Sequence, residues 1–264
     1  MTSSIEGSAP NLLQLLADPQ RWVLLQELAA SDRRVGELTA LTGKPQNLVS
    51  YHLRALRSAG IVTARRSAAD GRDTYYRVDL ERCSDVLSHA GRALHPGVRL
   101  APAQPPPADR PRRRRVRVLF ICTGNSARSQ IAAALLDSLS GHSIEARSAG
   151  THPKALHPNA VRVLAERGID ISGNSTTPVS RYARTRFDQV ITLCDKAKEE
   201  CQGLGDGAVT AHWSMSDPSA AGGSDEATYP SFERTAEEIE VRVRFLIAQL
   251  TAASRQEGST HADR

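Results

Sequence analysis

Residues 116–129 read VRVLFICTGNSARS, and this stretch predicts the fold of the second half of the chain. An apolar run of strand type passes directly into small polar residues and then into an arginine. Five residues separate Cys122 from Arg128, and all are small or tolerate a positive φ, so successive backbone N–H groups can turn inward. They are Thr123, Gly124, Asn125, Ser126 and Ala127. The sequence therefore predicts a strand, an anion-binding loop and the start of a helix.

This predicted loop joins a thiol and a guanidinium to the N-terminus of a helix expected over residues 127–139. The partial positive charge there and the planar fork of Arg128 both favour a tetrahedral oxyanion. The same field favours the thiolate of Cys122, which is the nucleophilic form, and the Ser129 hydroxyl can stabilise it. A buried cysteine before an ordinary turn is the alternative. The strand before the loop, the glycine within it and the helical pattern after it favour catalysis.

In this context the stretch resembles the low-molecular-weight tyrosine phosphatases and the arsenate reductases that share their fold, over about residues 116–250. The resemblance implies a three-layer α/β domain, and the alternation of strand-like and helical runs predicts a parallel sheet with its ligand at the carboxyl ends of the strands. Strands are expected over residues 116–121, 143–148 and 187–193, and helices over 127–139, 159–167 and 235–252. The phrases SAGT (148–151) and RGIDIS (167–172) match parts of the family that shape the site.

The segment HWSMSDP, residues 212–218, places an aspartate in a loop that proline stiffens. By resemblance to the family's Asp-Pro motif, Asp217 protonates the oxygen that leaves the central atom of the anion. Asp-Pro is also a common turn, but the His-Trp pair before it is similar to arsenate reductases and favours the catalytic interpretation.

Cys194 ends the apolar run QVITLC, and Cys201 follows seven residues later across the helix-forming segment DKAKEE. Two cysteines with this spacing are similar to those of thioredoxin-linked arsenate reductases. The resemblance implies a relay in which Cys194 attacks the sulfur of Cys122 and Cys201 then forms a disulfide with Cys194. Seven helical residues rise about 10.5 Å, whereas disulfide-bonded Cα atoms lie about 4.4 to 6.8 Å apart. The segment must therefore unwind, unless both cysteines are buried and inert.

The reductant that this resemblance implies is external, either thioredoxin or a small thiol, and no bound cofactor or metal is expected. The chain departs from some reductases at three positions. Ala127 stands where some carry a cysteine, and Gln202 where proline is frequent. Ala133 stands where some carry a glutamate associated with potassium, so a potassium ion is not expected.

The first half of the chain predicts a winged helix-turn-helix over residues 10–95. Helices are expected over residues 11–16, 20–30, 35–42, 46–58 and 80–94, and a β-hairpin over 61–66 and 74–78. In the helix over 46–58, the apolar positions at helical spacing are Leu48, Tyr51, Leu53 and Leu56. The order and the phrases QNLVSYHLRALRSAGIV and GRDTYYRV resemble the ArsR family of small dimeric repressors.

By that resemblance the helix over 46–58 reads base edges in the major groove, and the hairpin contacts phosphate or the minor groove. The candidate contacts are Gln46, Asn47, Ser50, Tyr51, His52 and Arg54 on the helix and Arg65, Arg66 and Arg72 on the hairpin. The resemblance also implies a homodimer that binds operator DNA. A protein-interaction module with solvated arginines is the alternative.

The familiar arsenite site of ArsR repressors is not expected, because the helix before the turn reads VGELTALTG and carries no cysteine. Cys83 stands apart from other cysteines, with His89 and His95 further on, and a helix-packing role is favoured over metal binding. Whether the domain senses arsenite is left open.

Charge separates the two halves of the chain. Residues 1–117 hold 19 Lys and Arg against 11 Asp and Glu, and residues 118–264 hold 15 against 18. The basic half is therefore the one expected to meet DNA. Six prolines and an arginine run over residues 96–115 predict a semi-extended linker between domains 1–95 and 116–264, although the arginines could also touch DNA.

No apolar run is long enough to cross a membrane, and no signal pattern opens the chain, so a cytoplasmic location is expected. The sequence favours an arsenate reductase fused to a DNA-binding regulator. A tyrosine phosphatase fused to the same domain, and a regulator whose loop only senses an oxyanion, are the alternatives.

Overall fold

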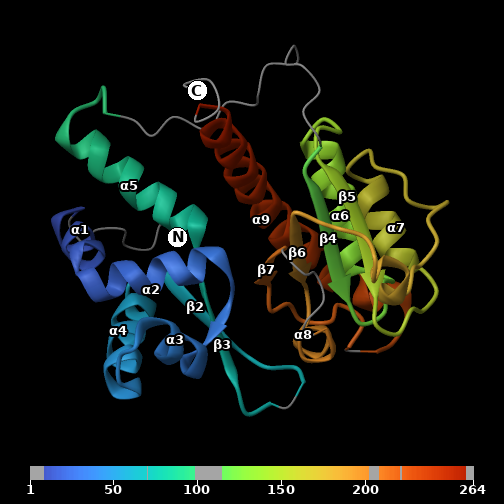
Figure 1. The fold of residues 1–264 in the computed structure, drawn as a ribbon, viewed down its shortest axis with the longest axis horizontal. Coiled ribbons are helices and arrows are strands. Elements are labelled where there is room, and N and C mark those ends of the chain that lie inside the picture. The colour runs from blue at the N-terminus through green and yellow to red at the C-terminus, as the bar shows by residue number, and fades with distance from the viewer. Residues whose placement is uncertain (1–8, 70, 99–114, 202–207, 221, 260–264) are drawn as a thin grey trace. The chain divides into compact units, whose positions relative to one another are not determined.

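The computed structural model describes residues 9–69, 71–98, 115–201, 208–220 and 222–259 (Figure 1). The chain forms two compact units, Met1–Pro102 and Ala103–Arg264. The first combines helices with a small antiparallel sheet, and the second is built on a parallel sheet. Most of the predicted linker, residues 99–114, lies outside the described residues.

The helices of the N-terminal unit follow local signals in the sequence. Asp18 caps the second helix, because its carboxylate accepts hydrogen bonds from the backbone N–H groups of Gln20 and Arg21 at 2.9 and 3.0 Å. Gly43 ends the third helix with a φ of +64°, the left-handed conformation that glycine adopts without strain. The helices are α1 (Ala9–Ala17), α2 (Pro19–Ala30), α3 (Val35–Thr42), α4 (Gln46–Ser58) and α5 (Leu80–Leu94).

The predicted hairpin is present as β2 (Val62–Arg66) and β3 (Thr74–Val78), paired antiparallel from Val62↔Val78 to Arg66↔Thr74. A further strand, β1 (Arg33–Arg34), pairs with β3 on its other side. The sequence did not predict β1, because two residues are too few to show an alternating pattern.

Helix α4 buries one face and exposes the other. Val49, Leu53 and Leu56 lie in the core of the N-terminal unit, at spacings of four and three residues. Of the four apolar positions at helical spacing, Leu53 and Leu56 are buried, whereas Tyr51 is 58% exposed and Leu48 is 36% exposed. Their apolar character alone did not indicate which face of the helix packs inward.

The second unit holds a four-stranded sheet in the order β5-β4-β6-β7, with every neighbouring pair parallel. This confirms the predicted parallel α/β fold. The strands are β4 (Arg117–Cys122), β5 (Glu145–Gly150), β6 (Gln189–Thr192) and β7 (Val209–His212). The sequence analysis did not assign β7, which is only four residues long. Because the strands are parallel, their carboxyl ends and the loops that follow them share one edge of the sheet.

Helices cover this sheet and complete its core. They are α6 (Arg128–Leu139), α7 (Pro158–Ala165), α8 (Asp195–Glu200) and α9 (Asp225–Ser259). Helix α6 packs against β4, β5 and α9, whereas α8 lies against β4 and β6. Phe120 of β4 and Phe232 of α9 are fully buried in this core.

Helix α9 begins ten residues before the predicted start at residue 235, and Pro230 lies inside it. Proline disfavours a helix interior, but Tyr229 and Phe232 on either side of it are buried, so packing outweighs the local signal. No helix in the described part of the chain is both long and apolar enough to span a membrane.

Candidate active site

The loop between β4 and α6 has its carbonyl groups turned outward. Four carbonyls of residues 122–126 accept hydrogen bonds from backbone N–H groups of the segment 151–157, at 2.8 to 3.2 Å. The pairs are Thr151 to Cys122, His152 to Thr123, Lys154 to Gly124 and His157 to Ser126. With these carbonyls engaged by the segment 151–157, the loop N–H groups are available for the anion nest that the sequence predicts.

Asn125 sets the turn of the loop with a φ of +49°, in the left-handed region that asparagine tolerates. Its side-chain Nδ2 donates to the Ser129 hydroxyl at 2.9 Å, and its side-chain oxygen accepts from the backbone N–H of Thr177 at 2.7 Å. Gly150, at the end of β5, leaves room for this turn. A Cβ there would lie 2.8 Å from the Thr123 carbonyl oxygen, which explains the glycine of the SAGT phrase.

The Cys122 sulfur lies where donors converge on it. The N–H of Asn125 lies 3.2 Å from Sγ, and the Ser129 hydroxyl lies 3.0 Å from it. Because Asn125 donates to the Ser129 oxygen, the hydroxyl proton is free to point at the sulfur. The Ser129 hydroxyl and the Asn125 backbone N–H thus both lie within hydrogen-bond distance of the predicted nucleophile.

Arg128 is 6% exposed, at the first position of α6. One terminal nitrogen donates to the Met215 carbonyl at 3.2 Å, and the other lies 3.2 Å from the Asp217 carboxylate. Its Nε is buried and has no hydrogen-bond partner among the described residues. Since a buried unpaired donor is costly, Nε is available to an oxyanion in the loop.

The structure places Asp217 beside the loop as an ion-pair partner of Arg128. Burial raises its pKa, and the positive charge of Arg128, the hydrogen bonds from Ser219 and the charge of Lys154 outweigh that effect, so the pKa is lowered. The carboxyl is therefore ionised at neutral pH. A general acid must carry a proton, so this role requires a change when substrate binds.

Cys194 also lies at the anion loop. Its sulfur is 3.2 Å from the Thr123 hydroxyl, although the two residues are 71 positions apart. The parallel pairing of β4 with β6 brings their carboxyl ends together, and Cys194 is the second residue after β6. Burial raises the pKa of the Cys194 thiol, and the charge of Arg128 and the bond to Thr123 offset this only in part.

Cys201 lies at the opposite end of α8, which it caps through a hydrogen bond from its N–H to the Ala197 carbonyl. Burial, together with Glu200 and Cys194, raises the pKa of its thiol to about 11. All four cysteines are free thiols. The structure thus brings Cys194 to the loop and leaves Cys201 a helix length away.

Lys154 is a residue of this site that the sequence analysis missed. Its N–H donates to the Gly124 carbonyl, and its ammonium charge contributes to the lowered pKa of Asp217. A lysine in an irregular loop carries no motif, so only its contacts with residues distant in sequence identify it.

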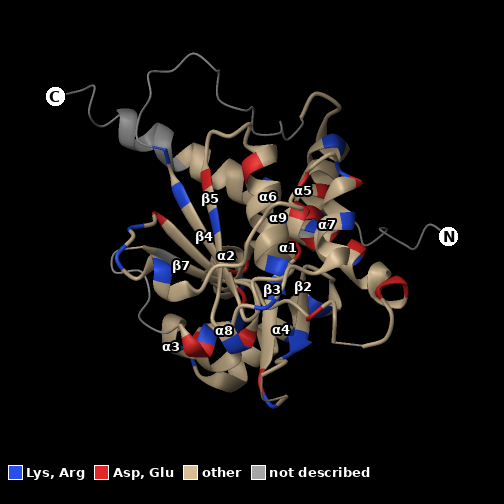
Figure 2. Cartoon of the chain, turned by 90° about the vertical axis from the view of Figure 1, so that its right-hand side faces the viewer, with Lys and Arg blue, Asp and Glu red and all other residues tan. Residues whose placement is uncertain are grey.

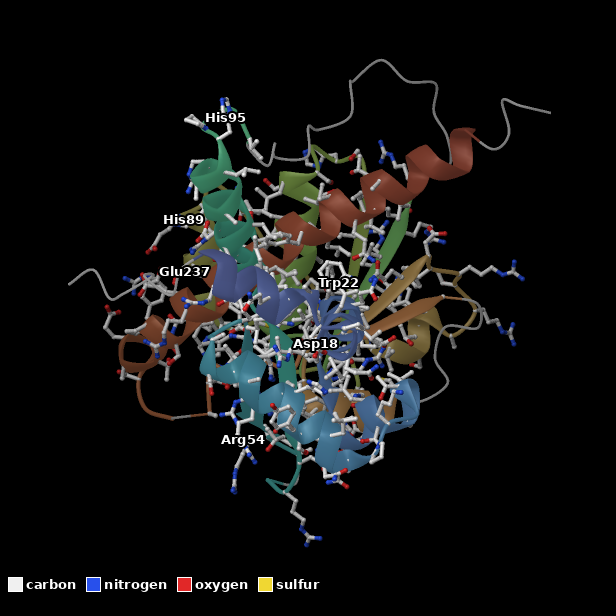
Figure 3. All side chains as sticks on the ribbon, turned by 90° about the vertical axis from the view of Figure 1, so that its left-hand side faces the viewer. Asp18, Trp22, Arg54, His89, His95 and Glu237 are labelled. Carbon is white, nitrogen blue, oxygen red and sulfur yellow. The ribbon has the colours of Figure 1, made fainter. Side chains whose placement is uncertain are left out.

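The predicted DNA-binding residues fall into two groups. Gln46, Asn47, Tyr51 and Arg54 of α4 are exposed, Ser50 is half-buried, Arg66 and Arg72 of the hairpin are exposed, and Arg65 is half-buried. Figure 2 shows the Lys and Arg of the chain in blue, and in Figure 3 Arg54 points away from the ribbon. His52 differs, because it is 7% exposed and its Nδ1 lies 3.9 Å from the Asp18 carboxylate. It faces the core of the unit, not the surface that α4 presents.

The N-terminal unit shows no cluster of metal-ligating side chains within its described residues. Burial, followed by the charge of Asp79, raises the pKa of the Cys83 thiol to about 11, which fits a packing role. His89 and His95 are exposed along and just after α5 (Figure 3).

Comparison with known proteins finds two families. The family described as "Low molecular weight phosphotyrosine protein phosphatase" matches residues 117–256, and "Bacterial regulatory protein, arsR family" matches residues 18–64. The arsenate reductases of Halalkalibacterium halodurans and Bacillus subtilis are each 35% identical over 127 residues, which cover 48% of this chain and 91% of theirs. The solved thioredoxin-dependent arsenate reductase of Corynebacterium glutamicum is 33% identical, over 52% of this chain and 63% of that chain, with a TM-score of 0.38.

Proposed function

Because the chain belongs to the low molecular weight phosphotyrosine protein phosphatase family and carries an arsR-family helix-turn-helix, we propose that it reduces arsenate to arsenite and binds operator DNA. One observation carries the reductase proposal, namely the second thiol at the anion loop, with Cys194 Sγ 3.2 Å from the Thr123 hydroxyl. Hydrolysis of a phosphate ester needs one nucleophile, whereas reduction needs two electrons from a pair of sulfurs. The names of the curated relatives support the same reaction.

In the first step the Cys122 thiolate attacks the arsenic of bound arsenate. A sulfur–arsenic bond forms, and one arsenic–oxygen bond breaks with release of water. The loop N–H groups and Arg128 hold the remaining oxygens. The oxygen that leaves must be protonated, and we assign this role to Asp217, whose carboxylate lies 3.2 Å from Arg128.

The ion pair between Arg128 and Asp217 explains why Asp217 would become protonated, and so able to act as a general acid, only when substrate binds. The positive charge of Arg128 lowers the pKa of Asp217 in the free protein. An oxyanion that binds Arg128 weakens the interaction of Arg128 with Asp217 and places a negative charge near the carboxyl. Both effects raise the pKa. Asp217 therefore becomes a better acid in the complex than in the free protein.

In the second step Cys194 attacks the Cys122 sulfur. A disulfide forms, the sulfur–arsenic bond breaks, and its electron pair stays on arsenic, which leaves as arsenite. Cys201 then attacks Cys194, frees the Cys122 thiolate and leaves a Cys194–Cys201 disulfide. Because α8 holds these two cysteines at its opposite ends, this last step requires α8 to unwind. An external dithiol reduces the disulfide, and thioredoxin is our candidate.

Four polar side chains among the described residues near the loop suit a small inorganic anion. Thr123, Lys154, Asp217 and Ser219 offer hydroxyl, ammonium and carboxylate groups. An aromatic leaving group is bound best by an apolar or aromatic wall. A phosphomonoesterase is nevertheless the second candidate, because it would use the same loop.

The full chain should oxidise NADPH in the presence of thioredoxin and thioredoxin reductase only when arsenate is added. We expect this turnover to exceed hydrolysis of p-nitrophenyl phosphate, because only reduction uses the second thiol, Cys194, at the loop. Inorganic phosphate should inhibit by competing for the loop. Brisk ester hydrolysis without arsenate turnover would establish the phosphatase instead.

For the N-terminal unit we propose that α4 enters the major groove and the hairpin contacts the backbone or the minor groove. The exposed Gln46, Asn47 and Arg54 suit base edges, and Arg65, Arg66 and Arg72 suit phosphate. His52 is left out, because it faces the core. We further propose a homodimer through the outer helices, where Leu13, Trp22 and Leu87 are exposed around one apolar groove. Trp22 is labelled in Figure 3.

Arg66→Ala and Arg72→Ala should weaken binding to operator and random DNA alike and lower the salt dependence by roughly one phosphate contact each. Gln46→Ala should instead weaken operator binding selectively, by about 1 to 3 kcal/mol. The chain's own promoter and a scrambled duplex, titrated at several salt concentrations, provide the measurement. Arg234→Ala, an exposed arginine of the second unit, is the control. Equal affinity of the wild-type chain for both duplexes would refute sequence-specific binding.

A further inference from the structure

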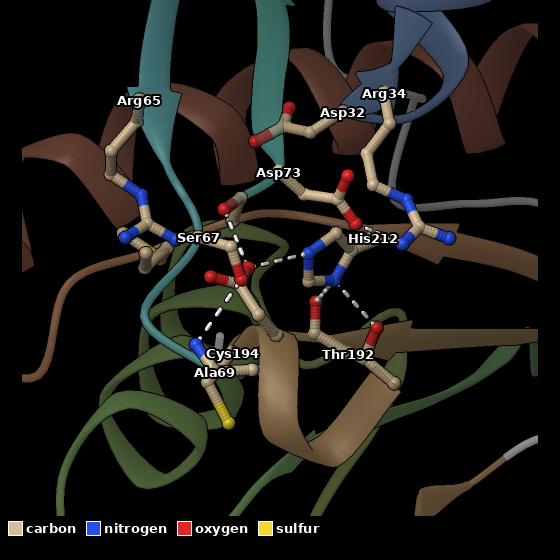
Figure 4. Close-up of polar contacts among 12 residues, drawn as sticks. Asp32, Arg34, Arg65, Ser67, Ala69, Asp73, Thr192, Cys194 and His212 are labelled. Carbon is tan, nitrogen blue, oxygen red and sulfur yellow. Dashed lines mark hydrogen bonds and ion pairs between the residues drawn. The ribbon is translucent and has the colours of Figure 1, made fainter. Parts of the chain in front are cut away.

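Asp195, the first residue of α8, is the centre of a polar cluster that the proposed reaction does not use. Its Oδ1 accepts a hydrogen bond from the Ser214 hydroxyl at 2.6 Å and lies 3.0 Å from Nε2 of His212. The other ring nitrogen of His212 lies 2.8 Å from the Thr192 hydroxyl. Figure 4 shows the dashed lines that join His212 to Thr192, with Cys194 close by. The carboxylate only accepts, so the serine and the imidazole both donate to it.

The cluster holds the backbone on both sides of Cys194. Thr192 lies two residues before this cysteine, and Asp195 follows it directly. His212 ends β7, and Ser214 lies in the segment that leads to Asp217. The position of Cys194 is thus tied to the neighbouring strand and to the loop that supplies Asp217.

The other end of α8 is held more weakly. Glu200 lies 3.5 Å from His152 and 3.9 Å from Lys196, and the side chains of both partners are more than half exposed. Exposed ion pairs of this kind contribute little, because water and salt screen them. The contacts of Asp195 with Ser214 and His212, at 2.6 and 3.0 Å, lie among buried side chains, where water screens them least, so they are the stronger attachment. The two ends of α8 therefore differ in how readily they open.

We propose that Asp195 is a positioning residue for the relay. It fixes Cys194 Sγ beside the anion loop, where the attack on Cys122 takes place. It also holds the N-terminal end of α8 in place. The helix therefore unwinds from its other end, at Glu200, and Cys201 moves toward Cys194. This inference rests on the proposed reductase function.

The test isolates the second step in the full chain with Cys201→Ser, in which the relay stops at the Cys122–Cys194 disulfide. After addition of arsenate, the reaction is quenched at intervals and the disulfide is quantified by peptide mass spectrometry. Adding Asp195→Ala should slow disulfide formation on the order of 10- to 100-fold, because a small displacement of the attacking sulfur is costly. Asp195→Asn keeps one acceptor oxygen, so its rate of disulfide formation should lie between that of Cys201→Ser alone and that of Cys201→Ser with Asp195→Ala. Ser214→Ala removes one donor and should slow the step less.

A second readout separates positioning from a general loss of structure. Inorganic phosphate should protect Cys122 from iodoacetamide equally well in all these variants, because none of the hydrogen bonds described above for the loop between β4 and α6 is made by Asp195. Asp188→Ala is the matched control, since Asp188 accepts a hydrogen bond from the Arg117 N–H at 2.8 Å beside the opposite end of β6. It should leave the disulfide rate unchanged.

An unchanged rate of disulfide formation in Asp195→Ala and in Ser214→Ala would overturn the positioning role of Asp195 and leave the proposed reductase function intact. A parallel loss of phosphate protection would show a merely structural role and would overturn it as well. If Cys201→Ser by itself formed no Cys122–Cys194 disulfide with arsenate, the relay would fail, and this proposal with it. If Asp195→Ala did not fold, Ser214→Ala would decide the question.

Discussion

Cys122→Ser is expected to abolish arsenate turnover, with a loss on the order of 10³-fold or more. The serine hydroxyl is not ionised at neutral pH and cannot form the sulfur–arsenic bond or the disulfide that follows. The measurement is arsenate-dependent NADPH oxidation by the full chain with thioredoxin and its reductase. Cys83→Ser is the matched control, because Cys83 lies in the N-terminal unit and packs against its core.

Arg128→Ala is expected to lower turnover by about 10² to 10³-fold, because it removes donors aimed at the developing negative charge. Arg128→Lys should recover little, since an ammonium group lacks the planar fork that spans two oxygens. Arg167→Ala is a closely matched control. Arg167 also bonds a backbone carbonyl, that of Val163, and pairs with a carboxylate, Glu240, but it lies outside the loop. Near wild-type activity in Cys122→Ser or Arg128→Ala would make the loop structural.

Cys194→Ser and Cys201→Ser should each abolish arsenate turnover while any hydrolysis of p-nitrophenyl phosphate persists. The reason is that ester hydrolysis uses only the loop, whereas reduction also needs Cys194 to release arsenite and Cys201 to free Cys122 from the disulfide. The two variants should stop at different points. Cys194→Ser should leave Cys122 without a disulfide partner, and Cys201→Ser should accumulate the Cys122–Cys194 disulfide.

Non-reducing peptide mapping after one addition of arsenate distinguishes these intermediates, with Cys83→Ser again as the control. Arsenate turnover that is indifferent to both substitutions would point to a route in which a small thiol resolves the Cys122 adduct directly. Loss of both activities in either variant would instead mean that the thiol supports the fold of the loop.

Much of the local structure could be predicted from the sequence, because local chemistry decides it. The bounds of α3, α4 and α5 agree with those predicted, since glycine, proline and aspartate end or cap these helices through contacts within a few residues. The anion loop was visible for the same reason. Its small residues, its asparagine and the strand and helix around it are adjacent in the chain.

Short strands and buried faces were harder to predict. β1 and β7 contain two and four residues, which is too few for a period of two to stand out. Leu48 and Tyr51 are apolar yet exposed, and His52 is polar yet buried. The partner surface, not the residue type, determines which face of a helix packs inward.

The sequence by itself determined the loop, its candidate nucleophile Cys122 and the alternation that makes the sheet parallel. Tertiary structure alone decided which distant groups meet there. The parallel register of β4 with β6 brings Cys194 to Thr123, and the loop after β7 brings Asp217 to Arg128. These contacts join residues 71 or more positions apart. No local pattern records such a distance, because it arises only when the strands pair and their carboxyl ends share one edge of the sheet.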